Sequence, residues 1–305
     1  MNKKIMKFSI SALALVMLFS GCNKDRDLKA KVGNVEIRAE QVNKEFEKLK
    51  KNLDQSQLKL LDESTEEGKR QVYAAKKRIA ERLADEVVFD EIIKRENIKV
   101  DEKLVDNQIN TIKTQLGDKY ESELKKSYEN EEEFKKGLKK NLEFKSFYEA
   151  FKKRNEIDDA QAIKSFNESK EKPLQFETTH VLVATKEEAE KVKERITKGE
   201  DISKVASEVS LEKGEGKLGY FIKGEMVREF YEAASKLNPG DISDPVKTKY
   251  GFHIIKLEEK ETDINKFQEA KKTAVLDSYK NKIIDEKLTE YIEKIKKELG
   301  YKINF

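Results

Sequence analysis

The sequence predicts an α+β fold in which one compact mixed domain interrupts a mostly helical chain, and three observations lead to this prediction. Apolar residues recur at helical spacing through the first half of the chain and again at its end. All three prolines lie between Pro173 and Pro245. Within that same stretch, short apolar runs typical of strands alternate with short helical patterns, which favours a compact domain of the α+β class.

The first 22 residues, MNKKIMKFSISALALVMLFSGC, indicate a targeting segment. Three lysines precede an apolar run from Phe8 to Phe19, which is too short to span a bilayer because a spanning helix needs about 20 residues. Small residues follow, and then Cys22, the only cysteine of the chain. The stretch resembles a bacterial lipobox, which implies a signal peptide over residues 1–21 and thioether lipidation of Cys22 with two fatty chains, enough for a stable anchor. The alternative is an ordinary secretory signal with a leftover thiol.

The charge balance argues against one class of function, and the cysteine content limits how the fold can be stabilised. Lys and Arg number 63 and Asp and Glu number 60, and the three lysines of the targeting segment account for the whole excess. Because the mature chain has no basic excess to neutralise phosphates, we expect no nucleic-acid binding. A single cysteine allows no internal disulfide, so packing alone must stabilise the fold.

Residues 22–172 predict a helical region that begins with a small hairpin. In LKAKVGNVEIR, apolar and polar residues alternate on both sides of Gly33 and Asn34, which favours a tight turn between two strands. The patterns that follow place apolar residues on one helix face and Lys and Glu on the other, as on a solvated helix surface. The apolar positions are Val72, Ile79, Leu83, Val87, Leu104, Ile109, Ile112, Leu116, Phe134, Leu138, Leu142, Phe147 and Phe151.

Residues 173–262 predict the inserted domain, and residues 263–305 return to a helical pattern. The inserted domain alternates ETTHVLVAT, KEEAEKVKERITKG, DISKVASEVS, LGYF, REFYEAASKL and GFHIIKL. This order lacks the doubly wound α/β alternation that a solute-binding lipoprotein would need. The last segment carries an amphipathic stripe from Ile264 to Leu299, which we expect to pack back on the N-terminal helices because its apolar face must be buried. The closing YKINF fits a strand.

The two histidines of the chain, His180 and His253, stand in matching apolar, strand-like runs, THVLVAT and YGFHIIKL. Either they form one site or each is a core residue. On adjacent strands the two imidazoles can share one hydrogen bond, which would fix their tautomers. Such a pair either performs proton chemistry or only shapes the site, and the sequence leaves both open. A metal site is not expected, because two histidines have no evident ligand set around them.

The order of motifs in residues 176–258 resembles that of the parvulin family of peptidyl-prolyl cis/trans isomerases. THVLV is followed by ITKGEDISKVASEVS and then by GKLGYFIKGEMVREFYEAASKLNPGDISDPVKTKYGFHIIKL. The resemblance implies a small antiparallel sheet with surrounding helices, inserted between helical N- and C-terminal segments that pack together. Rotation about an X–Pro bond crosses a barrier of about 18–20 kcal/mol without making or breaking a bond, so no cofactor or metal is expected. With its lipobox and flanking helical regions, the chain most resembles PrsA-type extracytoplasmic foldase lipoproteins.

Family positions map onto this sequence residue by residue. Leu218, Met226 and Phe230 match the apolar positions that cradle the proline ring of the substrate, although the same spacing also suits ordinary core residues. The two histidines match the histidine pair of the family. Thr248 and Tyr250 fall in the segment whose side chains join the histidine network. The resemblance therefore implies a catalytic role for Thr248 beside the histidines and a substrate-binding role for Tyr250.

Glu212 is the nearest match to the position at which parvulins commonly carry Cys or Asp. That position follows the serine that ends the A-x-x-x-S motif, here Ala206 to Ser210, and the loop after it is shorter than in many relatives. A carboxylate there would act in catalysis by repelling the substrate carbonyl oxygen, and the alternative is a solvated loop acid. The segment ATKEEAEK lacks the basic cluster of phospho-specific parvulins, so no phosphate selectivity is expected.

The resemblance implies a lipid-anchored isomerase and foldase on the extracytoplasmic face of the cell membrane of a Gram-positive bacterium. Its partners would be unfolded or partly folded exported polypeptides with X–Pro bonds, with residues 22–172 as the chaperone region and residues 173–262 as the isomerase domain. The alternative is a holdase whose parvulin fold binds peptides but has little isomerase activity. The sequence sets neither the client proteins nor the oligomeric state, so a homodimer through the helical region stays open.

Overall fold

The computed structural model describes residues 29–304, which belong to two compact units. Unit 1 falls within Met1–Glu156 and Lys287–Phe305, and unit 2 comprises Ile157–Glu286. The targeting segment and Cys22 lie outside the described residues. Within residues 29–304, no helix has both the length and the apolar character that crossing a membrane requires. The domain boundaries expected at residues 173 and 262 stay a prediction.

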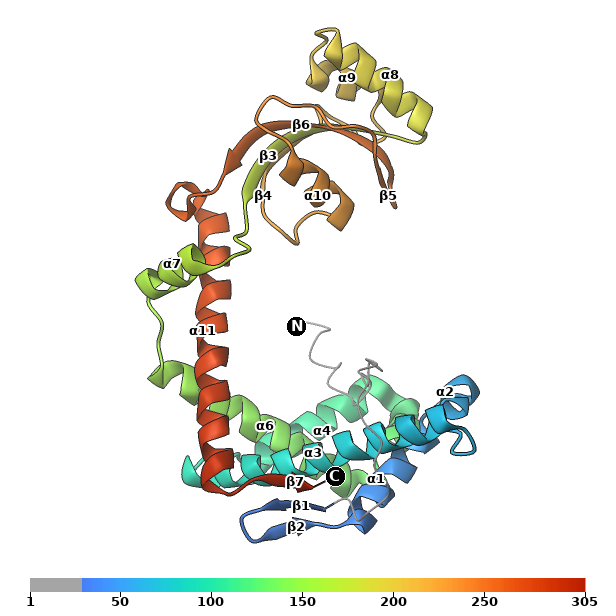
Figure 1. Ribbon diagram of the computed structural model, residues 1–305, viewed down its shortest axis with the longest axis vertical. Helices are drawn as coiled ribbons and strands as arrows, with labels where there is room; N and C mark the ends of the chain where they lie inside the picture. The colour runs from blue at the N-terminus through green and yellow to red at the C-terminus, as the bar shows by residue number, and fades with distance from the viewer. Residues whose placement is uncertain (1–28, 305) are drawn as a thin grey trace. The chain divides into compact units, whose positions relative to one another are not determined.

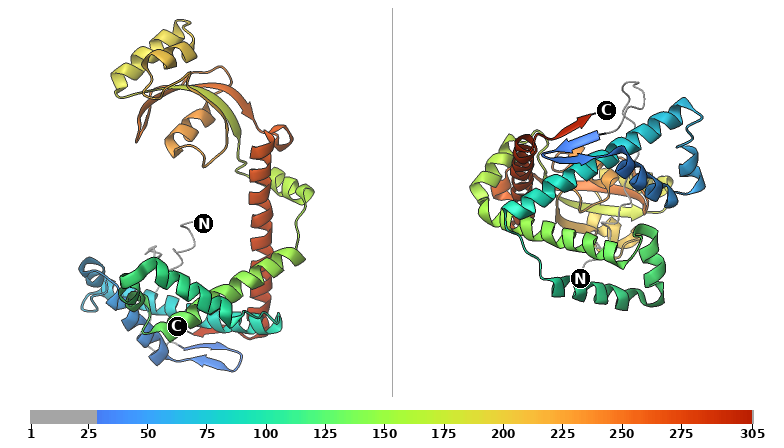
Figure 2. Two further views of the ribbon diagram at one scale, coloured as in Figure 1. Left: turned by 180° about the vertical axis from the view of Figure 1, so that it is seen from behind. Right: turned by 90° about the horizontal axis from the view of Figure 1, so that it is seen from below.

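A three-stranded antiparallel sheet of unit 1 joins the two ends of the described chain. Its strands are β1 (Lys29–Val32), β2 (Val35–Ile37) and β7 (Lys302–Asn304), in the order β2-β1-β7 (Figure 2). The expected hairpin is present, and Gly33 makes its turn with a φ of +59°, a conformation that favours glycine. The expected C-terminal strand is β7, which pairs with β1.

Six α-helices of unit 1 follow the hairpin, and their ends match the polar residues of the sequence. Side chains of Asp54, Thr65, Asp101 and Asn130 accept hydrogen bonds from the first turns of four of them, which satisfies backbone N–H groups that have no partner within a helix. The six helices are α1 (Ala39–Lys51), α2 (Gln55–Lys59), α3 (Glu66–Arg95), α4 (Glu102–Leu116), α5 (Tyr120–Ser127) and α6 (Glu131–Arg154).

Unit 2 is built on a four-stranded antiparallel sheet in the order β4-β3-β6-β5, which the fold prediction anticipated (Figure 1). Helices α8 and α9 cover one face of this sheet, and α10 covers the other. The strands are β3 (Gln175–Val183), β4 (Lys217–Phe221), β5 (Val246–Thr248) and β6 (Gly251–Glu261). The helices are α8 (Lys186–Thr197), α9 (Ile202–Val209) and α10 (Arg228–Lys236).

The long helix α11 (Glu269–Glu298) contributes to both units. Its first part packs in unit 2 against α7 (Asp159–Glu168), where Phe166 contacts Tyr279 with ring centroids 5.6 Å apart. Its last part packs in unit 1 against α6, where Tyr291 lies 5.7 Å from the ring of Phe151. The helical N- and C-terminal segments thus pack together as predicted, while the first part of the C-terminal stripe is buried on α7 instead.

Candidate active site

The sheet of unit 2 brings the two histidines together. His180 on β3 lies opposite Ile255, and His253 on β6 lies opposite Leu182, so both rings project from the same face of the sheet, offset by two residues. Their Nδ1 atoms are 3.1 Å apart and their ring planes differ by 16°. Both side chains are buried, at 3% and 4% exposure. The predicted hydrogen bond between adjacent strands is therefore present.

The pair belongs to a longer chain of hydrogen bonds. Thr248 Oγ1 lies 2.9 Å from His253 Nε2 and accepts the backbone N–H of Tyr250 at 3.1 Å. At the other end, His180 Nε2 lies 3.2 Å from Glu212 Oε2. The structure thus brings together His180, His253, Thr248 and Glu212, all of which the sequence analysis selected.

The acceptor at the Glu212 end determines the direction of this chain of hydrogen bonds. The Glu212 side chain is 56% exposed, and an ionised carboxylate only accepts hydrogen bonds, so His180 donates from Nε2. Nδ1 of His180 then accepts from Nδ1–H of His253, and Nε2 of His253 accepts the hydroxyl proton of Thr248. This assignment gives every ring nitrogen a partner while both imidazoles stay neutral.

Burial favours the neutral form of both rings. Burial, together with a smaller effect of charge on the nearby His180, lowers the pKa of His253 to about 4. Burial also lowers the pKa of His180 below its ordinary value, and the Glu212 carboxylate partly opposes that shift. At neutral pH the site therefore holds an uncharged histidine pair beside one exposed negative charge.

The residues matched to the proline cradle lie on the same face of the sheet. The Phe230 ring, from α10, stands edge-on to both imidazoles, with centroids 5.7 Å from His180 and 5.3 Å from His253. Leu218 and Met226 pack in the same apolar cluster but are only half-buried, whereas Phe230 is 2% exposed. Side chains that remain half-exposed beside a buried aromatic ring can contact a ligand.

Tyr250 enters the site through its backbone rather than its side chain. Its N–H completes the hydrogen bonds of Thr248, but the phenol ring belongs to a residue that is 58% exposed and stands 5.0 Å from the Lys249 ammonium. The substrate-binding role expected for its side chain stays a prediction.

Sequence reasoning missed the residues that hold the Glu212 loop in place. The carbonyl of Gly216 accepts the N–H of His180 at 2.9 Å, and a Cβ added to this glycine would lie 2.0 Å from the His180 carbonyl oxygen. Gly216 also has a φ of +71°, so both its conformation and the close approach require glycine. The glycine-rich stretch KGEGKLGY was the signal that could have marked this contact.

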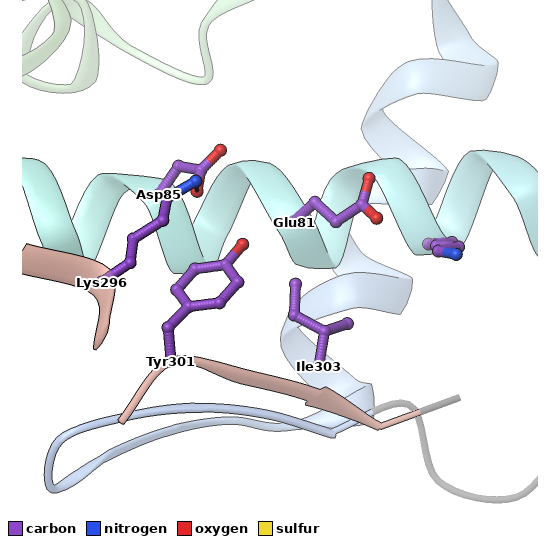
Figure 3. A pocket seen from close by; sticks show the side chains of 6 residues that line it. Glu81, Asp85, Lys296, Tyr301 and Ile303 are labelled. Atoms are coloured by element: carbon purple, nitrogen blue, oxygen red, sulfur yellow. Dashed lines mark ion pairs between the residues drawn. The ribbon is translucent and has the colours of Figure 1, made fainter. Parts of the chain in front are cut away.

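A separate cleft of about 390 Å³ lies in unit 1 (Figure 3). Its charges compensate one another, because Lys296 pairs with Asp85 at 3.0 Å and its ammonium lies 4.8 Å from the Tyr301 ring centre. None of the residues selected from the sequence lines it. The lining residues are Lys77, Glu81, Asp85, Lys296, Tyr301 and Ile303.

Comparisons with known proteins match this chain to two family models and to several relatives. A model of the PPIC-type PPIase domain matches residues 166–259, and a model of the SurA-like N-terminal domain matches residues 1–147. The foldase protein PrsA of Clostridium tetani is 36% identical over 234 residues, which cover 71% of this chain and 69% of that protein. The foldase protein PrsA of Clostridium botulinum strain Langeland is 32% identical to this chain. The match covers 96% of this chain and 96% of that protein. A crystal structure of PrsA from Bacillus anthracis is 27% identical over 75% of this chain and all of that one, with a TM-score of 0.36.

Proposed function

The chain belongs to the PrsA family of foldases, and we propose from this premise that it is anchored to the membrane through Cys22 and assists the folding of exported polypeptides. Its PPIC-type domain makes it a parvulin-type peptidyl-prolyl cis/trans isomerase. The lipobox-like stretch before Cys22 supports the anchor, and the long helical region supports a surface for unfolded segments. The two histidines, Thr248, Glu212 and the apolar residues around Phe230 are the proposed site of isomerisation.

The proposed mechanism makes and breaks no covalent bond and depends on how the site holds the substrate. A twisted X–Pro bond loses amide resonance and carries less charge separation than either planar form, so a dry apolar site favours the twisted state. Leu218 and Met226 would hold the proline ring against Phe230. Glu212 would face the carbonyl oxygen before proline, whose partial negative charge is larger in the planar forms. Repulsion by the carboxylate would therefore destabilise the planar forms more than the twisted one.

The hydrogen bond between Glu212 and His180 is the single observation that carries this assignment. It fixes an exposed carboxylate beside a buried, neutral pair of rings on the apolar face that carries the proposed cradle. A solvated loop acid, the alternative considered from the sequence, would make no such contact with a buried ring.

Replacement of Met226 tests the cradle. Because Met226 is half-buried, M226A should keep the fold but lower kcat/KM for a proline-containing tetrapeptide by at least about tenfold. L237A is the matched control, since it removes an apolar side chain from the same cluster beyond the other end of α10. Unchanged kcat/KM in a folded M226A variant would contradict the cradle assignment.

Replacement of Cys22 tests the anchor. Metabolic labelling with a fatty-acid probe should mark the wild type and leave C22S unlabelled, and C22S should leave the membrane fraction because two acyl chains supply the stable attachment. A C22S protein that stays membrane-bound to the same extent would show that another element provides the attachment.

A further inference from the structure

The edge of β3 beside His180 is completed by a loop rather than by a strand. β4 pairs with β3 only as far as Thr179, which lies opposite Lys217. Beyond that point the loop 210–216 takes over, because His180 N–H donates to the Gly216 carbonyl at 2.9 Å and Leu211 N–H donates to the Leu182 carbonyl at 2.7 Å. Both ends of the loop that carries Glu212 are therefore fixed to β3, one at His180 itself and the other at Leu182.

The side chain of Ser210 joins the loop to the backbone of β3. Its Oγ accepts the N–H of Leu182 at 3.2 Å and the N–H of Glu212 at 3.3 Å. The hydroxyl oxygen thus occupies the place where the carbonyl of a neighbouring strand would accept the Leu182 N–H. Since Ser210 also ends helix α9, with its own N–H donated to Ala206 at 2.9 Å, it connects the helix, the strand and the loop.

We propose that Ser210 is a positioning residue, which fixes the backbone of Glu212 so that the carboxylate meets His180 Nε2 and holds the proton on that nitrogen. With the proton on Nε2, the Nδ1 atom of His180 is free to accept from His253. The position of one serine hydroxyl therefore selects the tautomers of both rings. The consequence for turnover rests on the proposed role of the histidines and Glu212 in isomerisation, whereas the consequence for the tautomers does not.

The geometry explains why the hydroxyl is needed. Leu182 is buried, so alanine at position 210 would leave its N–H without an acceptor. Leu211 and Glu212 are both exposed, at 59% and 56%, so their side chains add little packing that would hold the loop. Without the Ser210 oxygen, the Glu212 backbone loses a direct connection to β3 and the carboxylate is free to leave the ring.

The test compares S210A with S210T in the full mature chain, with S203A on the same helix as the matched control. Because the chain has only two histidines, ¹⁵N spectra of the imidazole nitrogens report His180 and His253 separately, provided that the purification tag contains no histidine. The wild type, S203A and S210T should show His180 protonated at Nε2 alone. S210A should show a mixture of the two tautomers, together with a kcat/KM lower by about tenfold, the size of one lost hydrogen bond.

The outcomes separate the positioning role of Ser210 from the proposed role of the histidines and Glu212 in isomerisation. A wild-type imidazole spectrum in S210A overturns the positioning role, whatever the activity. A changed spectrum with unchanged kcat/KM supports positioning and shows instead that the histidines and Glu212 do not contribute to isomerisation. If S210A does not fold, S210C decides by the same two readouts, since its sulfur keeps the approximate size but accepts hydrogen bonds weakly.

Discussion

The two faces of the β3–β6 pair differ in chemistry although they come from alternate residues of the same strands. The face towards α8 and α9 carries an apolar cluster that includes Val181, Val183 and Ile254. The face towards α10 combines apolar residues such as Ile255 with the buried histidine pair. Both faces exclude water to a similar degree, so burial alone does not explain why one of them carries polar groups.

The difference indicates which face is shaped by function. A buried polar group stabilises a fold only when its hydrogen bonds are satisfied. An apolar side chain of similar size would fill the same space without the free-energy cost of an unsatisfied polar group. On the α10 face, four side chains from three strands and one loop are arranged so that every imidazole nitrogen has a partner. Close packing of the sheet does not require this hydrogen-bonded arrangement, whereas the proposed function requires it.

The largest expected effect separates the two faces by their contribution to stability and activity. I254A on the α8–α9 face should lower the free energy of unfolding by about 2–5 kcal/mol while the folded fraction keeps its kcat/KM. F230A should lose a comparable free energy of unfolding, since Phe230 is as buried as a core residue, and should also lose activity. Urea unfolding and tetrapeptide kinetics measure both quantities. Equal activity loss in the two variants would remove the distinction between the faces.

A second expectation concerns the free energy of unfolding at acidic pH, because only the face towards α10 carries the buried histidines. The pKa of His253 is lowered to about 4 in the folded protein, so between that value and about 6.5 the unfolded chain binds more protons than the folded one. The stabilising contribution is therefore fully present above pH 6.5 and is lost as the pH falls towards 4, by up to about 3 kcal/mol. Urea unfolding at several pH values measures it.

The control for this expectation is H180L/H253L, which lacks both titrating rings but keeps the carboxylates. Its stability should fall less between neutral and mildly acidic pH than that of the wild type. Parallel decreases in the two proteins would mean that carboxylates account for the whole acid effect.

A smaller effect is expected from breaking the pair rather than removing it. H253L leaves Nδ1 of the buried His180 without its donor, at a cost of about 1–3 kcal/mol in the free energy of unfolding. H180L/H253L removes both polar groups, so it should recover part of that loss and retain more isomerase activity than either single variant. A double variant that is no better than the worse single one would contradict a mainly geometric role for the pair.

The fold and most of the site were accessible from the sequence because their signals are local. Helical spacing, the hairpin at Gly33 and the motif order of residues 176–258 each need only neighbouring residues. The hydrogen bond between the histidines could be anticipated because two rare polar residues stood in matching apolar strands. Met226 and Phe230 were selected from the family resemblance, which did not distinguish the half-buried methionine from the fully buried phenylalanine.

The remainder depends on three-dimensional contacts that leave weak traces in the sequence. The register of β3 shifts beside Thr178 on both of its neighbours, and only strand pairing in three dimensions determines such a bulge. Likewise, the contact of Glu212 with His180 depends on the edge contacts of Ser210 and Gly216. Tyr250 was selected because it falls in the segment whose side chains join the histidine network, whereas its backbone N–H makes the contact in the site.

The pH dependence of kcat/KM tests most directly the central claim that the histidines act as a neutral, hydrogen-bonded pair that shapes the site. Both rings have lowered pKa values, so we expect the pair to stay neutral from mildly acidic to mildly alkaline pH. We therefore expect kcat/KM on a tetrapeptide substrate to stay flat over this range while circular dichroism shows a folded chain. A bell-shaped profile, combined with complete loss of activity in folded H180L/H253L, would contradict this account and make the pair a general acid and base.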